Sequence, residues 1–230
     1  MLLFTTTIQL KNKAKADIES KWEMTDLRIL TKIVGIELTI TNDAISISSN
    51  QYIKNILNKE RMAQLNSVST PLDHNVPIIP NPEGNIRDRS NAYIQLLGEL
   101  QYVANAMCLD ITYAVNRLAS YTANPSLQHQ TALKRILRYL SGTSDYCIIY
   151  KALPEQSDFF HGYANAAYAN TDENRSTTGY VFLAGEGAIT WSSKQQISMA
   201  LSSTEAEYIA LRGWMQGMLV EELIYRIGSS

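Results

Sequence analysis

The sequence predicts a mixed α+β protein, because its hydrophobic period changes along the chain. Apolar residues recur at helical spacing through residues 91–141, whereas after about residue 146 they alternate, as in strands with one buried face. Four alternating segments follow one another, and a long helical segment comes after them. Because strands and helices are grouped rather than interleaved, we expect an antiparallel sheet with a helix beside it.

The first part of the chain predicts a helix, a hairpin and a second helix. The first helix is expected over 8–26, and alternating apolar residues predict a β-hairpin over 32–50. Asn42 and Asp43 are placed at its turn because both tolerate left-handed backbone angles. In the next segment, 50–65, the apolar residues Ile53, Ile56 and Leu57 have helical spacing.

The middle of the chain predicts a linker and three helices. Residues 69–90 hold four prolines and a glycine, which is typical of a linker or an extended crossing segment. Three helical segments follow, at 91–107, 110–122 and 126–141. The third is expected to begin after Pro125 and to end on Gly142, because proline and glycine commonly flank helices in this way.

The last part predicts four strands and a long helix. The strands are expected at 147–153, 159–169, 176–185 and 187–196. Gly185-Glu186-Gly187 is most simply a tight hairpin turn, because it lacks the lysine and the flanking helix of a phosphate-binding loop. A long helix is expected from Ser202 onward.

Composition limits the classes of function. The 230 residues are 45% apolar and 18% charged, and the net charge is −2, so any nucleic-acid role needs a local basic face. No run approaches the roughly 20 apolar residues of a membrane span, and the N-terminus does not resemble a signal peptide. We therefore expect a soluble intracellular protein. His74, His129 and His161 share no metal-ligand spacing, and no nucleophilic hydrolase motif is present.

Four motifs identify a family resemblance. They are "VSTPLD" at 68–73, the stretch from "LGELQYVANAM" to "YLSGT" at 97–143, "STTGYVFLAGEGAITWSSKQQ" at 176–196 and "ALSSTEAEYIAL" at 200–211. Together they resemble the Pol polyprotein of copia-type retrotransposons, at the end of reverse transcriptase and the start of RNase H. The resemblance implies the end of a polymerase palm at 1–68, the linker at 69–90, a helical thumb or connection at 91–145 and a truncated RNase H-like domain at 146–230.

The resemblance also implies a defective nuclease site. Asn165 occupies the position of the first-strand aspartate, and Glu207 is the remaining helix carboxylate. The polymerase aspartates of the family would precede Met1, and a further RNase H aspartate would follow residue 230. RNase H chemistry uses two metal ions held by carboxylates, which a neutral amide replaces poorly. We therefore expect no catalysis and no bound metal in this chain, although the intact family uses Mg²⁺.

Glu207 also has a structural interpretation. Both Ser202-x-x-Glu205 and Thr204-x-x-Glu207 fit a capping box, in which the glutamate accepts a hydrogen bond from a free backbone N–H at the start of a helix. Asp172 and Glu173, which follow the strand at 159–169, are expected in a solvated turn.

Three cations mark a candidate nucleic-acid surface. Lys134, Arg135 and Arg138 lie on adjacent turns of the helix at 126–141, opposite its apolar side chains. By the resemblance they would contact phosphates of an RNA–DNA hybrid or a duplex, although an ordinary solvated helix face explains them as well. Two alternatives to a Pol fragment therefore stay open: a retained, non-catalytic nucleic-acid-binding module, and a decaying reading frame without selected function.

The strand at 159–169 carries a further prediction. In the RNase H fold a later strand pairs with its open side, and that strand would lie past residue 230. We therefore expect "FFHGYANAAYA" to form a sheet edge. Because the edge has almost no charge, it would invite self-association with other chains.

Overall fold

The computed structural model describes residues 8–23, 30–81, 87–151 and 160–228. The chain divides into two compact units, Met1–Thr31 and Lys32–Ser230. The first unit contains α1 (Ile8–Glu19), which confirms a helix in this region. A turn follows α1 directly, in which the Ser20 hydroxyl donates to the Asp17 carbonyl, so the helix is shorter than expected. Residues 24–26 of the predicted helix lie outside the described residues.

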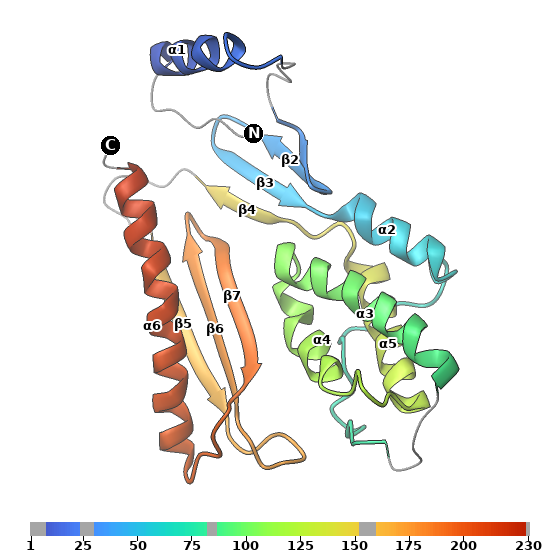
Figure 1. Cartoon of the computed structure of the whole chain (residues 1–230). Coiled ribbons are helices and arrows are strands. Elements are labelled where there is room, and N and C mark those ends of the chain that lie inside the picture. Colours follow the sequence, from blue (N-terminus) through green and yellow to red (C-terminus); the bar gives the residue numbers. More distant parts are fainter. Residues whose placement is uncertain (1–7, 24–29, 82–86, 152–159, 229–230) are drawn as a thin grey trace. The chain divides into compact units, whose positions relative to one another are not determined.

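The second unit begins with a four-stranded antiparallel sheet, here called sheet A (Figure 1). Its order is β1-β2-β3-β4, and the bounds are Lys32–Ile33, Ile36–Ile40, Ala44–Ser48 and Ile148–Lys151. The predicted hairpin is confirmed as β2 and β3, with Asn42 and Asp43 in the connection. Strand β4 comes from about 100 residues later and pairs with β3, so that Ile148 lies opposite Ile47.

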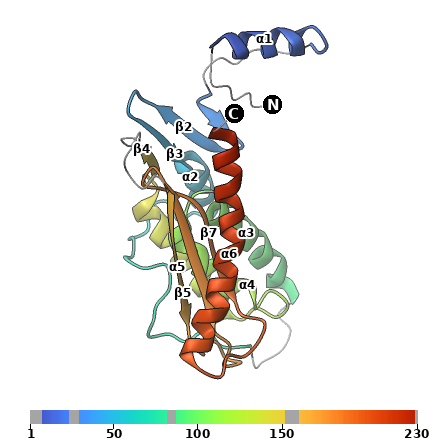
Figure 2. The same ribbon diagram turned by 90° about the vertical axis from the view of Figure 1, so that its left-hand side faces the viewer.

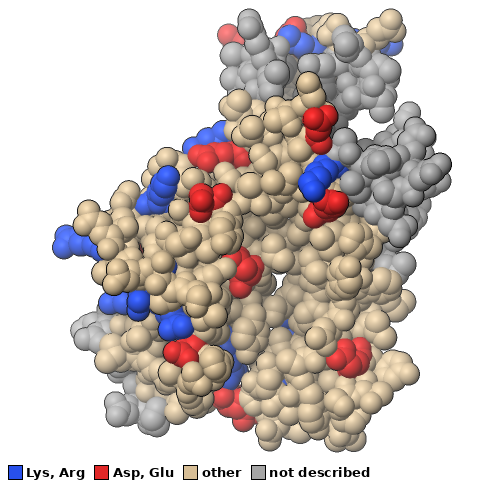
Figure 3. Space-filling model, turned by 180° about the vertical axis from the view of Figure 1, so that it is seen from behind, with Lys and Arg blue, Asp and Glu red and all other residues tan. Residues whose placement is uncertain are grey.

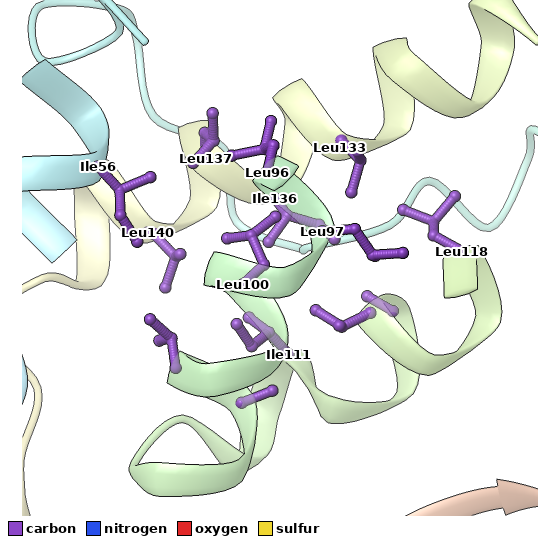
Figure 4. Packing of buried hydrophobic residues seen from close by; sticks show 14 of the residues in the cluster. Ile56, Leu96, Leu97, Leu100, Ile111, Leu118, Leu133, Ile136, Leu137 and Leu140 are labelled. Carbon is purple, nitrogen blue, oxygen red and sulfur yellow. The ribbon is translucent and has the colours of Figure 1, made fainter. Parts of the chain in front are cut away.

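Between β3 and β4 the chain forms a group of helices, here called the helical block. It consists of α2 (Asn50–Lys59), α3 (Arg87–Ala106), the short 3-10 helix η1 (Leu109–Ile111), α4 (Thr112–Ala119) and α5 (Leu127–Thr143). Leu100, Leu118, Ile136 and Leu137 are completely buried at its centre, where side chains of α3, α4 and α5 meet (Figure 4). Ile53, Ile56 and Leu57 of α2 join this core, as their spacing predicted.

Several helix ends differ from the prediction: α2 ends at Lys59 rather than at residue 65, and α4 ends at Ala119 rather than at residue 122. α3 begins at Arg87 rather than at residue 91, so the last residues of the expected linker are helical. No glycine or proline lies between Gly84 and this start. α5 continues through Gly142 to Thr143. A Cβ atom at Gly142 would lie only 2.7 Å from the Ser67 Cβ atom. This glycine therefore permits close packing rather than ending the helix.

The last third forms a three-stranded antiparallel sheet, sheet B, in the order β5-β6-β7. The strands are β5 (Phe160–Ala167), β6 (Thr177–Ala184) and β7 (Gly187–Gln195), and all three were predicted. Gly185 and Glu186 connect β6 to β7 with φ angles of 56° and 66°. Two consecutive residues with positive φ are the signature of a tight hairpin turn, which confirms the turn expected here.

Sheet B makes contacts on both faces, with α6 on one face and, at β7, with the helical block on the other. The long helix α6 (Ser203–Gly228), also predicted, lies along β5 and β6 (Figure 2). On this face a Cβ atom at Gly162 would be 3.0 Å from the Trp214 indole nitrogen of α6. On the other face the Trp191 indole donates a 2.8 Å hydrogen bond to the Ala104 carbonyl of the helical block. The α+β class is thus confirmed. None of the described helices is long and apolar enough to cross a membrane.

Candidate functional site

Asn165 lies in the middle of β5, opposite Gly179 of β6. Its side chain is exposed, and its Oδ1 atom accepts a 2.8 Å hydrogen bond from the backbone N–H of the next residue, Ala166. The amide oxygen is therefore already engaged with the backbone of its own strand.

Glu207 lies in the second turn of α6 and is exposed. The first turn is capped by other residues. The Glu205 N–H donates to the Ser202 hydroxyl at 3.1 Å, and the Glu205 carboxylate accepts from the Leu201 N–H at 2.7 Å. The cap at Ser202 and Glu205 is therefore formed. Thr204 lies inside the helix, so the alternative box with Glu207 is not formed.

The structure does not join Asn165 to Glu207 by a hydrogen bond. Side chains alternate along a strand, and β5 pairs with β6 without a bulge. Asn165 therefore lies on the opposite face from Gly162, which packs against α6. Within the described ranges, no three histidine, cysteine or acidic side chains gather as a metal-ligand set.

The three cations of α5 differ in their surroundings. Lys134 is exposed. Arg135 donates to the Thr70 carbonyl at 3.3 Å and to its hydroxyl at 3.0 Å, and it lies 3.4 Å from an Asp73 carboxylate oxygen. Arg138 donates a 2.8 Å hydrogen bond to the Asn66 carbonyl. The two arginines therefore hold the irregular segment after α2 against α5.

A groove of about 500 Å³ lies beside these cations. Its walls are mainly aliphatic, and charged residues stand along them. The lining residues are Leu72, Asp73, Val76, Ile78, Leu127, Gln128, Thr131, Ala132, Lys134, Arg135 and Arg138. A groove of this size and character is large enough for a small organic ligand. No sequence motif pointed to it, because its two walls are about 55 residues apart along the chain.

Positive charge is not concentrated on the face of the molecule that Figure 3 shows. Figure 3 shows Lys and Arg side chains interspersed with Asp and Glu, rather than a continuous basic surface. This agrees with the net charge of −2. A nucleic acid would therefore meet separate cations here rather than an extended positive field.

A polar joint connects α4 to the loop between β5 and β6, and no sequence motif predicted it. Arg117 forms a 2.7 Å ion pair with Asp172 and donates to the Ile78 carbonyl at 3.1 Å. The Tyr121 hydroxyl donates to both Asp172 and Ile78. Burial, reinforced by the hydrogen bond to Asp172, raises the pKa of Tyr121. Asp172 does lie in the expected turn, but it is paired rather than only solvated.

His129 extends this joint into the core. It is fully buried and stacks on Tyr121, with ring centroids 4.3 Å apart. Its Nδ1 atom accepts a 2.8 Å hydrogen bond from the Ser126 N–H and so caps α5. Burial lowers the pKa of His129, because the charged imidazolium loses its hydration. This histidine is therefore a structural cap.

Two adjoining polar hollows, of about 270 and 200 Å³, lie beside this joint. They share Arg117, Ser120, Thr171 and Gln195. The arginine is already paired with Asp172, and the other three groups are neutral. Lys194 also lines the larger hollow, and Asp172 and Glu173 line the smaller one, so charges of opposite sign stand beside these hydrogen-bonding groups. The only local sequence signal was the i, i+4 spacing of Arg117 and Tyr121, which gives a cation–π contact of 5.3 Å.

Comparison with known proteins gives a consistent result. The chain is 34% identical, over 86% of its length, to a retrovirus-related Pol polyprotein from transposon TNT 1-94 of Nicotiana tabacum. It is 33% identical, over 94% of its length, to that from transposon RE2 of Arabidopsis thaliana. A putative transposon Ty5-1 protein of Saccharomyces cerevisiae is 29% identical over 91% of the chain and 68% of its own length.

The chain spans about 15% of each of the two Pol polyproteins. No family model matches the chain, and no solved structure matches it. Identities of 33 to 34% that extend over 86 to 94% of the chain nevertheless confirm the predicted resemblance. The chain therefore belongs to the family of retrovirus-related Pol polyproteins of transposons.

Proposed function

We propose that this chain is a non-cleaving segment of a copia-type Pol polyprotein, which joins the end of a reverse transcriptase to an RNase H-like unit. Strands β1 to β3 and the helical block correspond to the polymerase end, and β4, sheet B and α6 to the RNase H-like unit. The Pol relatives, which match both parts in one continuous stretch, support this assignment.

Asn165 carries the proposal that the segment does not cleave. A two-metal nuclease needs charged oxygen ligands, and this position supplies a neutral amide whose oxygen already accepts the Ala166 N–H. Glu207 stands exposed on α6 as the remaining carboxylate of the motif. The helical block favours a folded product over a decayed reading frame, because it has a continuous buried aliphatic core.

Incubation of the purified chain with a labelled RNA–DNA hybrid tests this proposal. We expect no cleavage with Mg²⁺ or Mn²⁺, and none in Asn165→Asp, because one restored carboxylate does not complete a two-metal site. Glu207→Gln is the matched control for contaminating nuclease. Cleavage by the parent chain that disappears in Glu207→Gln would overturn the proposal. Activity in Asn165→Asp would reveal further ligands.

Non-catalytic nucleic-acid binding is the second candidate, and the exposed amine of Lys134 favours it. Arg135 and Arg138 are largely used within the chain, so Lys134 would carry the electrostatic contact. The slope of the logarithm of the hybrid-binding constant against the logarithm of salt concentration measures such contacts. Lys134→Ala is then expected to reduce the magnitude of this slope by about 0.9 or less, the value for one phosphate contact. Lys194→Ala, which removes an exposed lysine of β7, is the control. Equal slopes in both variants would argue against this surface.

A further inference from the structure

Strand β5 is an edge of sheet B within the described part of the chain. It pairs with β6 over its full length, from Phe160 to Ala167, and no described strand pairs with its other side. Soluble proteins usually protect such an edge with a charge, a proline or a bulge. β5 has no lysine, arginine, aspartate or glutamate, no proline, and no register shift against β6. This edge is therefore competent to pair with another strand.

The hydrogen bond of Asn165 shows which backbone groups face outward. Its Oδ1 atom accepts from the Ala166 N–H, which therefore does not bond to β6. In an antiparallel strand the outward groups belong to every second residue. The N–H and C=O groups of Gly162 and Ala164 thus point to the same open side. They are the central groups that a further strand would bond.

Apolar side chains are exposed on β5 and on the side of α6 that faces away from sheet B. Tyr163 of β5 is 63% exposed. On α6, Tyr208, Leu211 and Met215 are also exposed, and they follow one another at i, i+3 and i+7. Ala206 and Ala210 are buried on the other side of this helix, toward sheet B. α6 is therefore apolar on two sides, and only one of them is covered by the described residues.

We propose that β5 pairs with β5 of a second copy of this chain, antiparallel and centred on Tyr163. The twofold axis then passes through the Tyr163 pair, perpendicular to the sheet. Gly162 lies opposite Ala164 of the second copy, and Phe160 lies opposite Ala166, so all outward-facing residues are matched in pairs. The two Tyr163 side chains meet on one face at a position without backbone hydrogen bonds, where Cβ atoms lie about 4.5–5.5 Å apart.

The same arrangement places the two α6 helices at packing distance. Neighbouring strands lie about 4.8 Å apart, and α6 lies across β5 and β6. The helix axes of the two copies are then about 10 Å apart, which is at the upper end of the range of about 8–10 Å at which helices pack. The twofold axis perpendicular to the sheet puts both helices on the same face. The pairing therefore brings the two helices side by side on one face of the joined sheet.

The chemistry of β5 favours a second copy as the partner. The strand has no charged residue that would select a partner of opposite charge, and none that would repel its own copy. An isologous contact uses the same patch twice and requires no other component. It also matches the exposed Tyr163 with an identical aromatic ring, a favourable cross-strand pair.

Sedimentation of the 230-residue chain over a concentration series tests the association. We expect a monomer–dimer equilibrium. Tyr163→Lys places like charges opposite each other and is expected to raise the dimer dissociation constant by about tenfold or more. Tyr146→Lys is the matched control, since Tyr146 is 66% exposed and lies outside β5. A monomer at all concentrations, or equal dissociation constants in the two variants, would overturn the proposal.

Cross-linking tests the register and does not depend on the lysine variant. The exposed Cys147 is first replaced by serine. In that background, Tyr163→Cys is expected to form a disulfide with its own copy under mild oxidation. Asn165→Cys is not expected to form this disulfide, because residue 165 lies opposite His161 of the second copy and not opposite its own counterpart. Cross-linking of Asn165→Cys in preference to Tyr163→Cys, or of neither in a dimeric sample, would exclude this pairing.

Discussion

The helical block and the layer formed by sheet B and α6 are stabilised differently. The core of the block contains long aliphatic side chains, and Leu100, Leu118 and Ile136 are completely buried. In the sheet layer most buried apolar residues are alanines, such as Ala206 and Ala210. Burial stabilises roughly in proportion to the apolar area removed from water, so each alanine contributes much less than a leucine. The block is therefore the more stable part of the chain.

Aromatic stacking partly offsets this difference in the sheet layer. Phe182 is completely buried, and its ring stacks on Phe160 at 5.4 Å and on Trp214 at 5.6 Å. Among the side chains that the structure describes, the layer thus has one large, completely buried residue, whereas the block has many. Other large apolar residues of the layer, such as Val181 and Leu183, are only partly buried, and Leu201, just before α6, is exposed. Four substitutions or conditions test this comparison, from the largest expected effect to the smallest.

Leu100→Ala is expected to lower the free energy of unfolding by about 2–5 kcal/mol, because it leaves a cavity in the aliphatic core. Leu201→Ala removes the same atoms from a side chain that is 85% exposed, so a change within about 0.5 kcal/mol is expected. Urea unfolding followed by circular dichroism measures both values. Equal losses would contradict the assignment of stability to the block.

Acidification should lower the free energy of unfolding through the buried His129 of α5. The pKa of His129 is lowered by burial, so the unfolded chain binds the proton more readily than the folded one. The contribution of His129 to stability is therefore fully present at pH values above about 6.5, the pKa in the unfolded chain. At lower pH the free energy of unfolding decreases by up to about 1.4 kcal/mol per pH unit, until the pH is below the folded pKa. Urea midpoints between pH 8 and 5 measure this slope. His129→Gln should remove part of it, whereas His74→Gln, at an exposed site, should not.

Trp191→Phe is expected to cost about 1 kcal/mol, because it removes the hydrogen bond from sheet B to the Ala104 carbonyl. Amide exchange in β7 should become faster, while the centre of α3 keeps its protection. Trp22→Phe is the control, since Trp22 is 72% exposed and lies in the first unit. An unchanged exchange rate in β7 would show that this contact does not hold the sheet against the block.

Arg138→Gln should give the smallest effect, about 0.5 kcal/mol, because the hydrogen bond to the Asn66 carbonyl is partly exposed to solvent. Lys134→Gln, one turn earlier, is expected to change nothing measurable in stability. Limited proteolysis within residues 60–81 would detect the loosening of this segment. Equal cleavage rates in the two variants would mean that Arg138 does not fasten it.

The sequence by itself determined the local elements and the family. The alternation in β5, β6 and β7 and the helical spacing in α2 and α5 were visible because each is a regular pattern within one segment. The Gly185-Glu186 turn was visible for the same reason, since its chemistry lies in adjacent residues. The family followed from motifs that stand in order along the chain.

Only the tertiary structure decided which distant segments meet. β4 pairs with β3 about 100 residues away, Asp172 pairs with Arg117 across 55 residues, and Arg135 reaches Thr70 across 65. Gly142, which looked like a helix end, instead lets Ser67 approach α5. Local propensity does not encode such contacts, because they form only when the buried core brings separate elements together. The role of each of these side chains depends on its neighbour in space rather than on its neighbour in sequence.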